Sequence, residues 1–383
     1  MVEVGDSQAH GIVDYFKDLD DPRSHVNRRH RLVDVIVISV LGVIAGADGP
    51  AAIAVWAGLN KQWLIDHLEL PQGIPSHDTI GRVLELLQPE AFQKCFTLWL
   101  EATFGSAREA DQPIVAIDGK SMRRSHDRGR GLGMLHIVSA WATERGIVLG
   151  QLATEAKSNE ITAIPELLDN INVQGTIVTI DAAGCQKNIA SDIIDGGGDF
   201  VLALKGNQGN LHAAVVDLFT EHLETEFAGV TVSRHTEDEK SHGRTEHREY
   251  YQIEAPADLP GRELWRGLKT IGVAIRTHEQ GGKEHTEVRY YINSLGRDAK
   301  VFARAVRGHW GIENTLHWSL DVTFREDENR TRGRRVANNL SWLRRIAITL
   351  FKQHPSKQSM AMKRRMAGWS RDFLLQLLTG KGI

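Results

Sequence analysis

The sequence predicts a mixed α/β core that is flanked by helical segments at both ends. Three observations predict it: apolar residues in 1–105 are spaced as in helices, β-branched runs alternate with helical stretches from about residue 113, and helical spacing returns after residue 298. The chain has 383 residues, 41% of them hydrophobic and 25% charged, which is enough to bury sizeable cores in two or three lobes.

The first segment, residues 1–105, is expected to form a helical domain. Its longest apolar run, Val35 to Ala47, has 13 residues, whereas a membrane span needs about 20, so we expect a buried helix there. Pro75 and Ser76 then precede another stretch with helical spacing, as helix-start residues do. The basic cluster at 23–31 leaves two interpretations open, a DNA-binding module or a packing lobe, because no helix-turn-helix signature is present.

The middle of the chain predicts strands and helices in alternation. Strand-like segments run from PIVAIDGKS (Pro113–Ser121) to DFVLALKG (Asp199–Gly206), with helical stretches between some of them. Residues 229–294 return to β-forming residues separated by turns, and we assign a β-rich insertion to about 207–297. The core then resumes with a helix over Val306–Val322, and residues 329–383 form a basic helical part.

Charge is unevenly distributed along the chain. The formal net charge is −3, yet residues 329–383 hold thirteen Lys and Arg against a single acid, Asp372. A basic end on an otherwise acidic chain predicts a polyanionic partner, most simply nucleic acid, and a solvated basic helix is the alternative.

Cysteine usage and the N-terminus indicate the compartment. Cys95 and Cys185 have no paired spacing, which argues against a disulfide framework and against a Cys-based zinc site. No basic-then-apolar signal sequence begins the chain. We therefore expect a soluble cytoplasmic protein without a membrane partner.

Three acidic residues suggest a metal site. Asp118 and Asp181 each end a strand-like, β-branched run, and Glu313 lies in the later helix. Burying an unpaired carboxylate is costly, and three that converge at a sheet edge would repel one another unless a divalent cation bound them. Mg²⁺ prefers such oxygens, and two ions about 4 Å apart support in-line phosphoryl displacement. The alternative is that both aspartates only cap helices or form turns.

Five longer motifs carry a family resemblance: AIDGKSMRRS (116–125), TIDAAGCQKNIA (179–190), GGDFVLALKGNQ (197–208), HGRTEHREYY (242–251) and RGHWGIENTLHWSLDVTFREDENR (307–330). Together with LVDVIVISVLGVIAGADG and PSHDTIGRVLELL near the N-terminus, they resemble the ISAs-type, or H-repeat-associated, insertion-sequence transposases, which are DDE enzymes. The resemblance covers essentially the whole chain.

The resemblance implies a ribonuclease-H-like catalytic domain over 106–383, with a β-strand insertion between the second Asp and the Glu. It places the catalytic and metal-binding triad on Asp118, Asp181 and Glu313. The implied reaction is cleavage at insertion-sequence ends and transfer of 3′-ends into target DNA, with Mg²⁺, for which Mn²⁺ can substitute. The implied partners are double-stranded DNA and a second copy in a synaptic complex at the nucleoid.

Two alternatives remain open at this point. One is a catalytically defective or domesticated DNA-binding protein of the same fold, and the other is a metal-dependent nuclease without strand transfer. The wider superfamily has Tyr seven and Arg four residues before the Glu and Lys seven after it, where this chain has Val306, His309 and Leu320. These departures put the expected DNA-end contacts in doubt.

Further candidates for DNA contact are basic residues near the triad motifs and in the basic end: Lys120, Arg123, Arg124, Lys205, Arg244, Arg307, His309, Arg332 and Arg335. The alternation of Arg244, Glu246 and Arg248 favours one strand face that grips DNA, with a cross-strand ion-pair ladder as the alternative. Trp310 and Trp318 are expected in the core. Additional carboxylates follow Glu313 and are candidates to assist it, namely Asp321, Glu326 and Asp327.

Overall fold

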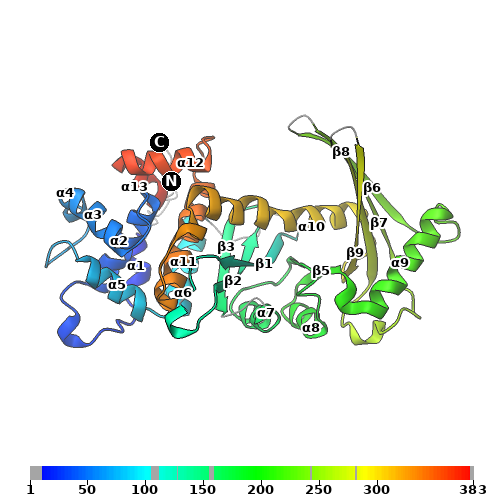
Figure 1. Ribbon diagram of the computed structural model, residues 1–383, viewed down its shortest axis with the longest axis horizontal. Helices are drawn as coiled ribbons and strands as arrows, with labels where there is room; N and C mark the ends of the chain where they lie inside the picture. The colour runs from blue at the N-terminus through cyan, green and yellow to red at the C-terminus, as the bar shows by residue number, and fades with distance from the viewer. Residues whose placement is uncertain are drawn as a thin grey trace, which may run out of the picture.

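The computed structural model describes residues 11–104, 112–126, 128–154, 159–241, 244–280 and 283–379 (Figure 1). Its helices are α1 (Ile12–Phe16), α2 (Leu32–Ile44), α3 (Pro50–Leu59), α4 (Lys61–Ile65), α5 (His77–Leu86), α6 (Pro89–Phe104), α7 (Glu160–Asp169), α8 (Lys187–Asp195), α9 (Gly209–Glu224), α10 (Ala299–Gly311), α11 (Arg334–Gln353), α12 (Met360–Trp369) and α13 (Arg371–Thr379). Its strands are β1 (Ile114–Met122), β2 (Leu135–Ala142), β3 (Ile147–Thr154), β4 (Ile177–Ile180), β5 (Asp199–Leu204), β6 (Ser233–Ser241), β7 (Arg244–Glu254), β8 (Thr270–Gln280) and β9 (Lys283–Asn293). The predicted mixed α/β class is confirmed.

All nine of these strands form one sheet, in the order β3-β2-β1-β4-β5-β9-β8-β7-β6. β1, β4 and β5 are parallel neighbours, and every other pairing is antiparallel. The four residues of β4 are all buried and apolar or Thr, as expected for a central parallel strand that is covered on both faces. The β-rich block at 229–294 therefore extends the core sheet through β9.

Helices cover both faces of the central strands (Figure 1). Val115 and Ile117 of β1 pack with Ile164 of α7 in one core cluster. On the other face Ile114 packs with Phe302 of α10 in a second cluster. Side chains alternate along a strand, so the even-numbered residues of β1 from position 118 to position 122 share a face, and the odd-numbered ones share the other.

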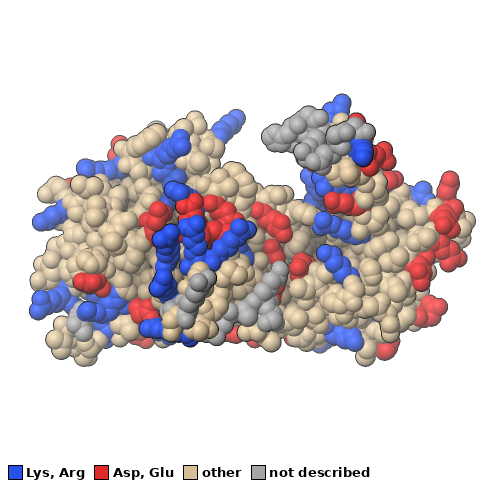
Figure 2. Space-filling model, viewed as in Figure 1, with Lys and Arg blue, Asp and Glu red and all other residues tan. Residues whose placement is uncertain are grey.

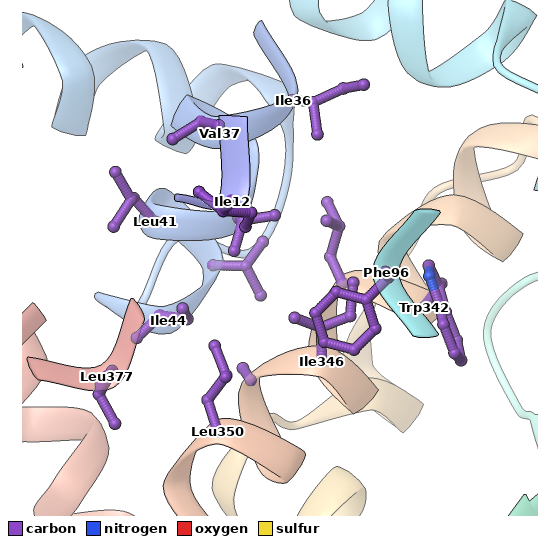
Figure 3. Packing of buried hydrophobic residues seen from close by; sticks show 14 of the residues in the cluster. Ile12, Ile36, Val37, Leu41, Ile44, Phe96, Trp342, Ile346, Leu350 and Leu377 are labelled. Atoms are coloured by element: carbon purple, nitrogen blue, oxygen red, sulfur yellow. The ribbon is translucent and has the colours of Figure 1, made fainter. Parts of the chain in front are cut away.

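The helices from the two ends of the chain share one core (Figure 3). The apolar run predicted as a buried helix is α2, whose 13 residues are all buried. Its Leu41 lies in the same cluster as Ile346 and Leu350 of α11 and Leu377 of α13. At another helix start that the sequence predicts, Ser76 caps α5 by accepting the backbone N–H of the third residue along at 3.3 Å.

The basic end is predicted to meet nucleic acid or solvent, and two arginines in the middle of α11 do neither. Arg344 and Arg345 are only 2% and 0% exposed. Both guanidinium groups lie 3.4 Å from a carboxylate oxygen of the fully buried Glu326. A buried cation must be paired, and these two are committed to the protein interior, so they cannot hold a DNA backbone.

Charged side chains on β6, β7 and β8 form a cross-strand ion-pair ladder. Glu246 pairs with Arg248, and it also accepts from Arg276 at 2.6 Å. Arg248 in turn lies 2.8 Å from Glu239 of β6. The ladder interpretation therefore describes Glu246 and Arg248 better than the DNA-gripping face that the sequence favoured, and the side chain of Arg244 lies outside the described residues.

No helix within the described ranges is long and apolar enough to cross a membrane.

Candidate active site

Asp118 and Asp181 lie side by side on neighbouring parallel strands. Ile117 of β1 is the register partner of Ile180 of β4. Asp118 and Asp181 are the residues that directly follow these two in the chain. The expectation that Asp118 ends its strand is wrong, because β1 continues to Met122 by pairing with β2. Asp181 does follow the last residue of its strand. Adjacent parallel strands thus bring the two carboxylates together, as the sequence predicts.

The turn after β4 orients Asp181. Its Oδ1 accepts the backbone N–H groups of Ala183 at 2.9 Å and Gly184 at 3.3 Å, so the turn-forming role also applies. The residue lines a cavity of about 460 Å³ between β4, β5, β9 and α10. Glu313 and His309 line the same cavity.

Glu313 lies where the helix changes its hydrogen-bonding pattern. α10 ends at Gly311, and the chain continues as two π-helical segments, η6 (Ile312–His317) and η7 (Ser319–Thr323). Such wide turns are rare and occur frequently at functional sites. The wider turn matters for the two histidines that flank Glu313, His309 and His317.

Those histidines contact different strands. His309 Nδ1 lies 3.2 Å from Thr179 Oγ1 of β4, whereas His317 Nδ1 lies 3.4 Å from Asp118 Oδ2 of β1. Burial lowers the pKa of His309. Burial, assisted by nearby cations of which Arg345 acts most strongly, lowers the pKa of His317 to about 3. Both imidazoles are therefore neutral at physiological pH.

The carboxylates at this site act on one another electrostatically. Burial is the main cause that raises the pKa of Asp118 to about 7, and the charges of Asp181, Glu160 and Glu313 add to it. A backbone hydrogen bond from Gly119 opposes the change. The site thus holds uncompensated negative charge around a buried carboxyl group. A divalent cation would offset the repulsion between these carboxylates.

The donor set suits a hard cation. Asp118, Asp181 and Glu313 offer carboxylate oxygens only, which is the chemistry that Mg²⁺ and Mn²⁺ accept. In the part of the chain that the structure describes, no three His, Cys, Asp or Glu side chains are already arranged to hold an ion. The three residues therefore fit a hard divalent cation by the chemistry of their oxygen atoms.

The basic residues after Asp118 are in different environments. Lys120 is only 8% exposed and lies 2.7 Å from Asp321 and 3.1 Å from Asp327. Arg123 and Arg124 are exposed, and Arg123 Nε also lies 3.0 Å from Asp327. The two aspartates therefore neutralise basic groups. Figure 2 shows acidic and basic side chains gathered side by side over α11 and the neighbouring helical stretch that follows α10.

The remaining basic candidates are spread over two regions. Lys205 is exposed at the rim of the cavity that Asp181 lines. Arg307 of α10 is paired with Glu239 of β6 at 2.8 Å. The other two, Arg332 and Arg335, are exposed before and within the first turn of α11.

Two of the departures from the superfamily signature serve packing. Val306 and Leu320 are both buried in apolar clusters. Of the acids that were candidates to assist Glu313, Glu326 is committed to the buried arginines of α11. The structure thus gives Val306, Leu320 and Glu326 roles in packing and in a buried ion-pair network.

Sequence reasoning missed several residues near the triad. Arg289 of β9 places its guanidinium 4.3 Å from the ring centroid of Trp310, and both line the cavity with Asp181. The side chains of His136 and Glu160 pack against Gly119, the residue after Asp118. Only glycine fits at that position, because a Cβ there would clash with both side chains. Only the fold brings these distant segments together, so no local spacing could have indicated them.

The two tryptophans around Glu313 are less buried than the sequence predicts. Trp318, expected in the core, is 54% exposed, and Trp310 is half-buried at the cavity. The expectation of a core position is therefore wrong for Trp318. The π-helical turns shift the helix faces on which such an expectation depends.

Comparisons with known proteins identify the family of the chain. The model of the family described as "Transposase DDE domain" matches residues 109–350, and that of "DDE_Tnp_1-associated" matches residues 13–100. The chain is 37% identical to "H repeat-associated putative transposase YhhI" of Escherichia coli K12, over 97% of this chain and 98% of that protein. It is 41% identical to "Putative transposase YncI" of Escherichia coli O157:H7, over 89% and 87% of the two chains.

Among solved structures, the chain is similar to a piggyBac transposase in a synaptic complex with hairpin DNA, with a TM-score of 0.40 and 9% identity over 96% of this chain and 76% of that one. That likeness is too low to carry an argument. The family matches and the relatives suffice: the chain belongs to the DDE transposase family, within its H-repeat-associated group.

Proposed function

We propose that this chain is a divalent-metal-dependent DNA transposase that cleaves at insertion-sequence ends and transfers the 3′-ends into target DNA. The observation that carries the proposal is that Asp118 and Asp181 follow register partners on neighbouring parallel strands. The charge of Glu313, in the π-helical segment, acts on Asp118 together with that of Asp181. The strand order β3-β2-β1-β4-β5, with only β1, β4 and β5 parallel, supports a ribonuclease-H-like catalytic core. Strands β6 to β9 are its insertion.

The three carboxylates would hold Mg²⁺, with Mn²⁺ as a substitute. When bound, the metal supplies an activated water or 3′-hydroxyl and stabilises the leaving oxygen of an in-line displacement. The chain itself orients the ligands. The turn at Ala183 fixes one oxygen of Asp181, and the neutral imidazole of His317 lies against Asp118 without adding positive charge that would repel a cation.

Phosphates of the DNA would meet the site from its basic rim. Lys205 and Arg289 line the cavity with Asp181, and further exposed or partly paired cations come from Arg123, Arg124, Arg332 and Arg335. On the face shown in Figure 2 the surface is hollowed above α10, between the C-terminal helices and the β-rich extension. We propose that duplex DNA lies there, that two copies join two ends in a synaptic complex, and that the protein works at the nucleoid.

The test is cleavage of a labelled duplex that carries the terminal repeat of the native element. The intact protein is compared with Asp181→Ala and with Asp217→Ala, a control that removes an exposed carboxylate from α9. Each is assayed with Mg²⁺, with Mn²⁺ and with EDTA, and DNA binding is measured in parallel. We expect metal-dependent cutting by the intact protein and the control, and binding without cutting by Asp181→Ala.

The same assay separates the alternatives. Binding without cutting by the intact protein in either metal would contradict the proposal and indicate a defective DNA-binding protein. Cutting without joining of the 3′-ends to a supercoiled target would indicate a nuclease. Cutting that persists in Asp181→Ala would remove the triad from the chemistry.

A further inference from the structure

Lys120 is a buried cation held by two carboxylates from one later segment. Its Nζ lies 2.7 Å from Asp321 Oδ1 and 3.1 Å from Asp327 Oδ1, and its side chain is 9% exposed. Lys120 follows Asp118 by two positions on β1, so both side chains leave the strand on the same face. A lysine that is desolvated between two acids is poorly placed to meet a DNA phosphate, because both pairs would have to break first.

The segment that supplies the two acids is attached on both sides. Asp327 also accepts a hydrogen bond from the backbone N–H of Arg123 at 3.3 Å, and its carboxylate lies 3.0 Å from Nε of the same arginine. These contacts attach Asp327 to the residue that directly follows β1. Arg325 has a left-handed backbone (φ 52°), and this turn directs the next residue, Glu326, away from β1 and towards α11. Residues 321–327 are thus clamped between β1 and α11.

The clamped residues, 321–327, begin inside the second π-helical segment, η7, and continue past its end. Glu313 is in η6 and Asp321 is in η7, and the stretch from Ile312 to Thr323 is π-helical throughout except at Trp318. π-Helical turns are rare and occur mostly as single turns, so a run of this length needs tertiary contacts to fix its position. Lys120 supplies such a contact through Asp321, between η7 and β1.

We propose that Lys120 is a positioning residue: through Asp321 and Asp327 it fixes the π-helical segment that carries Glu313 against the strand that carries Asp118. The inference rests on the proposed function. It gives Lys120, which the sequence predicts to contact DNA, a different role in the same reaction. The ion pairs set the separation between two of the three carboxylates, and a small misplacement of reacting groups costs about a hundredfold in rate.

The experiment compares Lys120→Met with Lys205→Met in the full-length protein. Both changes remove one lysine charge and keep a long side chain, but Lys205 is exposed at the cavity rim. For each variant we would measure DNA affinity as a function of salt, the cleavage rate at saturating DNA, and the amide hydrogen exchange of residues 312–328 without DNA or metal.

For Lys120→Met we expect unchanged affinity and salt slope, a cleavage rate lower by about tenfold or more, and faster exchange in residues 312–328. Lys120→Arg, which can still pair with both acids, should recover part of the rate. For Lys205→Met we expect weaker binding, a salt slope reduced by about 1, and unchanged exchange.

Two results would overturn the inference. One is a loss of affinity and salt slope in Lys120→Met that equals the loss in Lys205→Met, which would make Lys120 a phosphate contact. The other is unchanged exchange over 312–328. The exchange and binding measurements need no cleavage, so they remain decisive if the intact protein cuts no DNA and the proposed function fails.

Variants on the acidic side keep the test valid if Lys120→Met does not fold. Asp321→Asn leaves Lys120 with Asp327, and the side chain of Asp321 is already 40% exposed. The substitution should speed the exchange of the same segment and lower the cleavage rate without weakening DNA binding. An Asp321→Asn protein with intact exchange and rate would contradict the inference.

Discussion

Asp118 combines burial with three acidic neighbours, and this combination makes its charge costly in the metal-free protein. Its pKa is raised to about 7, so the folded state favours the protonated form. The stabilising effect of that preference is fully present below about pH 4, the ordinary pKa of an aspartate, and is lost as the pH rises through about 7. The charged form of Asp118 therefore destabilises the fold in the absence of a cation.

We predict that Asp118→Asn stabilises the metal-free protein at pH 8 and changes its stability little at pH 4. The difference should grow across pH 4 to 7 towards a value on the order of 4 kcal/mol, because a neutral amide cannot ionise there. Thermal unfolding in EDTA at a series of pH values measures it. Asp217→Asn is the control, and a difference between Asp118→Asn and the intact protein that does not vary with pH would contradict the prediction.

At the scale of residues the sequence could predict that Asp118 and Asp181 belong to neighbouring strands but not what surrounds them. The two β-branched runs ending in Asp118 and Asp181 indicated neighbouring strands, and the structure places them together. His317 and Glu160 could not be predicted as neighbours of Asp118. The first depends on a change from α- to π-helix, and the second comes from the start of a different helix.

At the scale of elements, α11 is held by a buried charge network instead of by an apolar stripe alone. Glu326 meets Arg344 and Arg345, and it accepts a hydrogen bond from Ser341 at 2.8 Å. Although burial alone would raise the pKa of Glu326, these two cations hold it below its ordinary value. Its contribution to stability is therefore present above about pH 4.5 and lost as the pH falls below that.

Glu326→Gln should destabilise the protein by about 3 to 5 kcal/mol at pH 7, because it leaves two guanidinium groups buried without an anion. Urea unfolding of the intact protein and the variant measures the difference. Glu328→Gln removes an exposed acid from the same turn and should cost about 1 kcal/mol or less. Equal effects of the two substitutions would show that the buried network adds no stability.

Helical spacing alone could not reveal this network. Arg344 and Arg345 lie off the apolar stripe of α11, which ordinarily indicates solvent, but α11 is surrounded by β2 and β3, the N-terminal helices and the turn at Glu326. The middle of α11, residues 339–351, is covered on every side and has no solvent face. The amphipathic pattern predicted the helix correctly and the environment of its polar residues incorrectly.

At the scale of the whole molecule, the basic end divides into an internal and an external set. Arg344, Arg345 and Lys363 are buried, whereas Arg332 and Arg335 remain exposed near the start of α11. Net charge therefore overstates how much of this end can meet DNA. Only exposed cations release counterions when they contact phosphates.

The double variant Arg332→Ala with Arg335→Ala should weaken DNA binding and lower the slope of log affinity against log salt by about 2. Titrations of a fixed duplex from low to moderate salt measure the slope. Arg266→Ala, which removes an exposed arginine paired with Asp195 elsewhere, is the control and should leave the slope unchanged. A slope that stays the same in the double variant would place the DNA elsewhere.

The shared core of the two chain ends has a consequence for how the protein is made. α2 is buried on every side, and its partners α11 and α13 are synthesised long after it. Until residues 334–379 have been made, the side chains of α2 lack their native cover, so this lobe cannot close earlier. A message that stops before residue 334 would yield a chain that holds Asp118, Asp181 and Glu313 but has an uncovered apolar helix, which is prone to aggregation and degradation. Only a copy that includes α11 and α13 would fold stably.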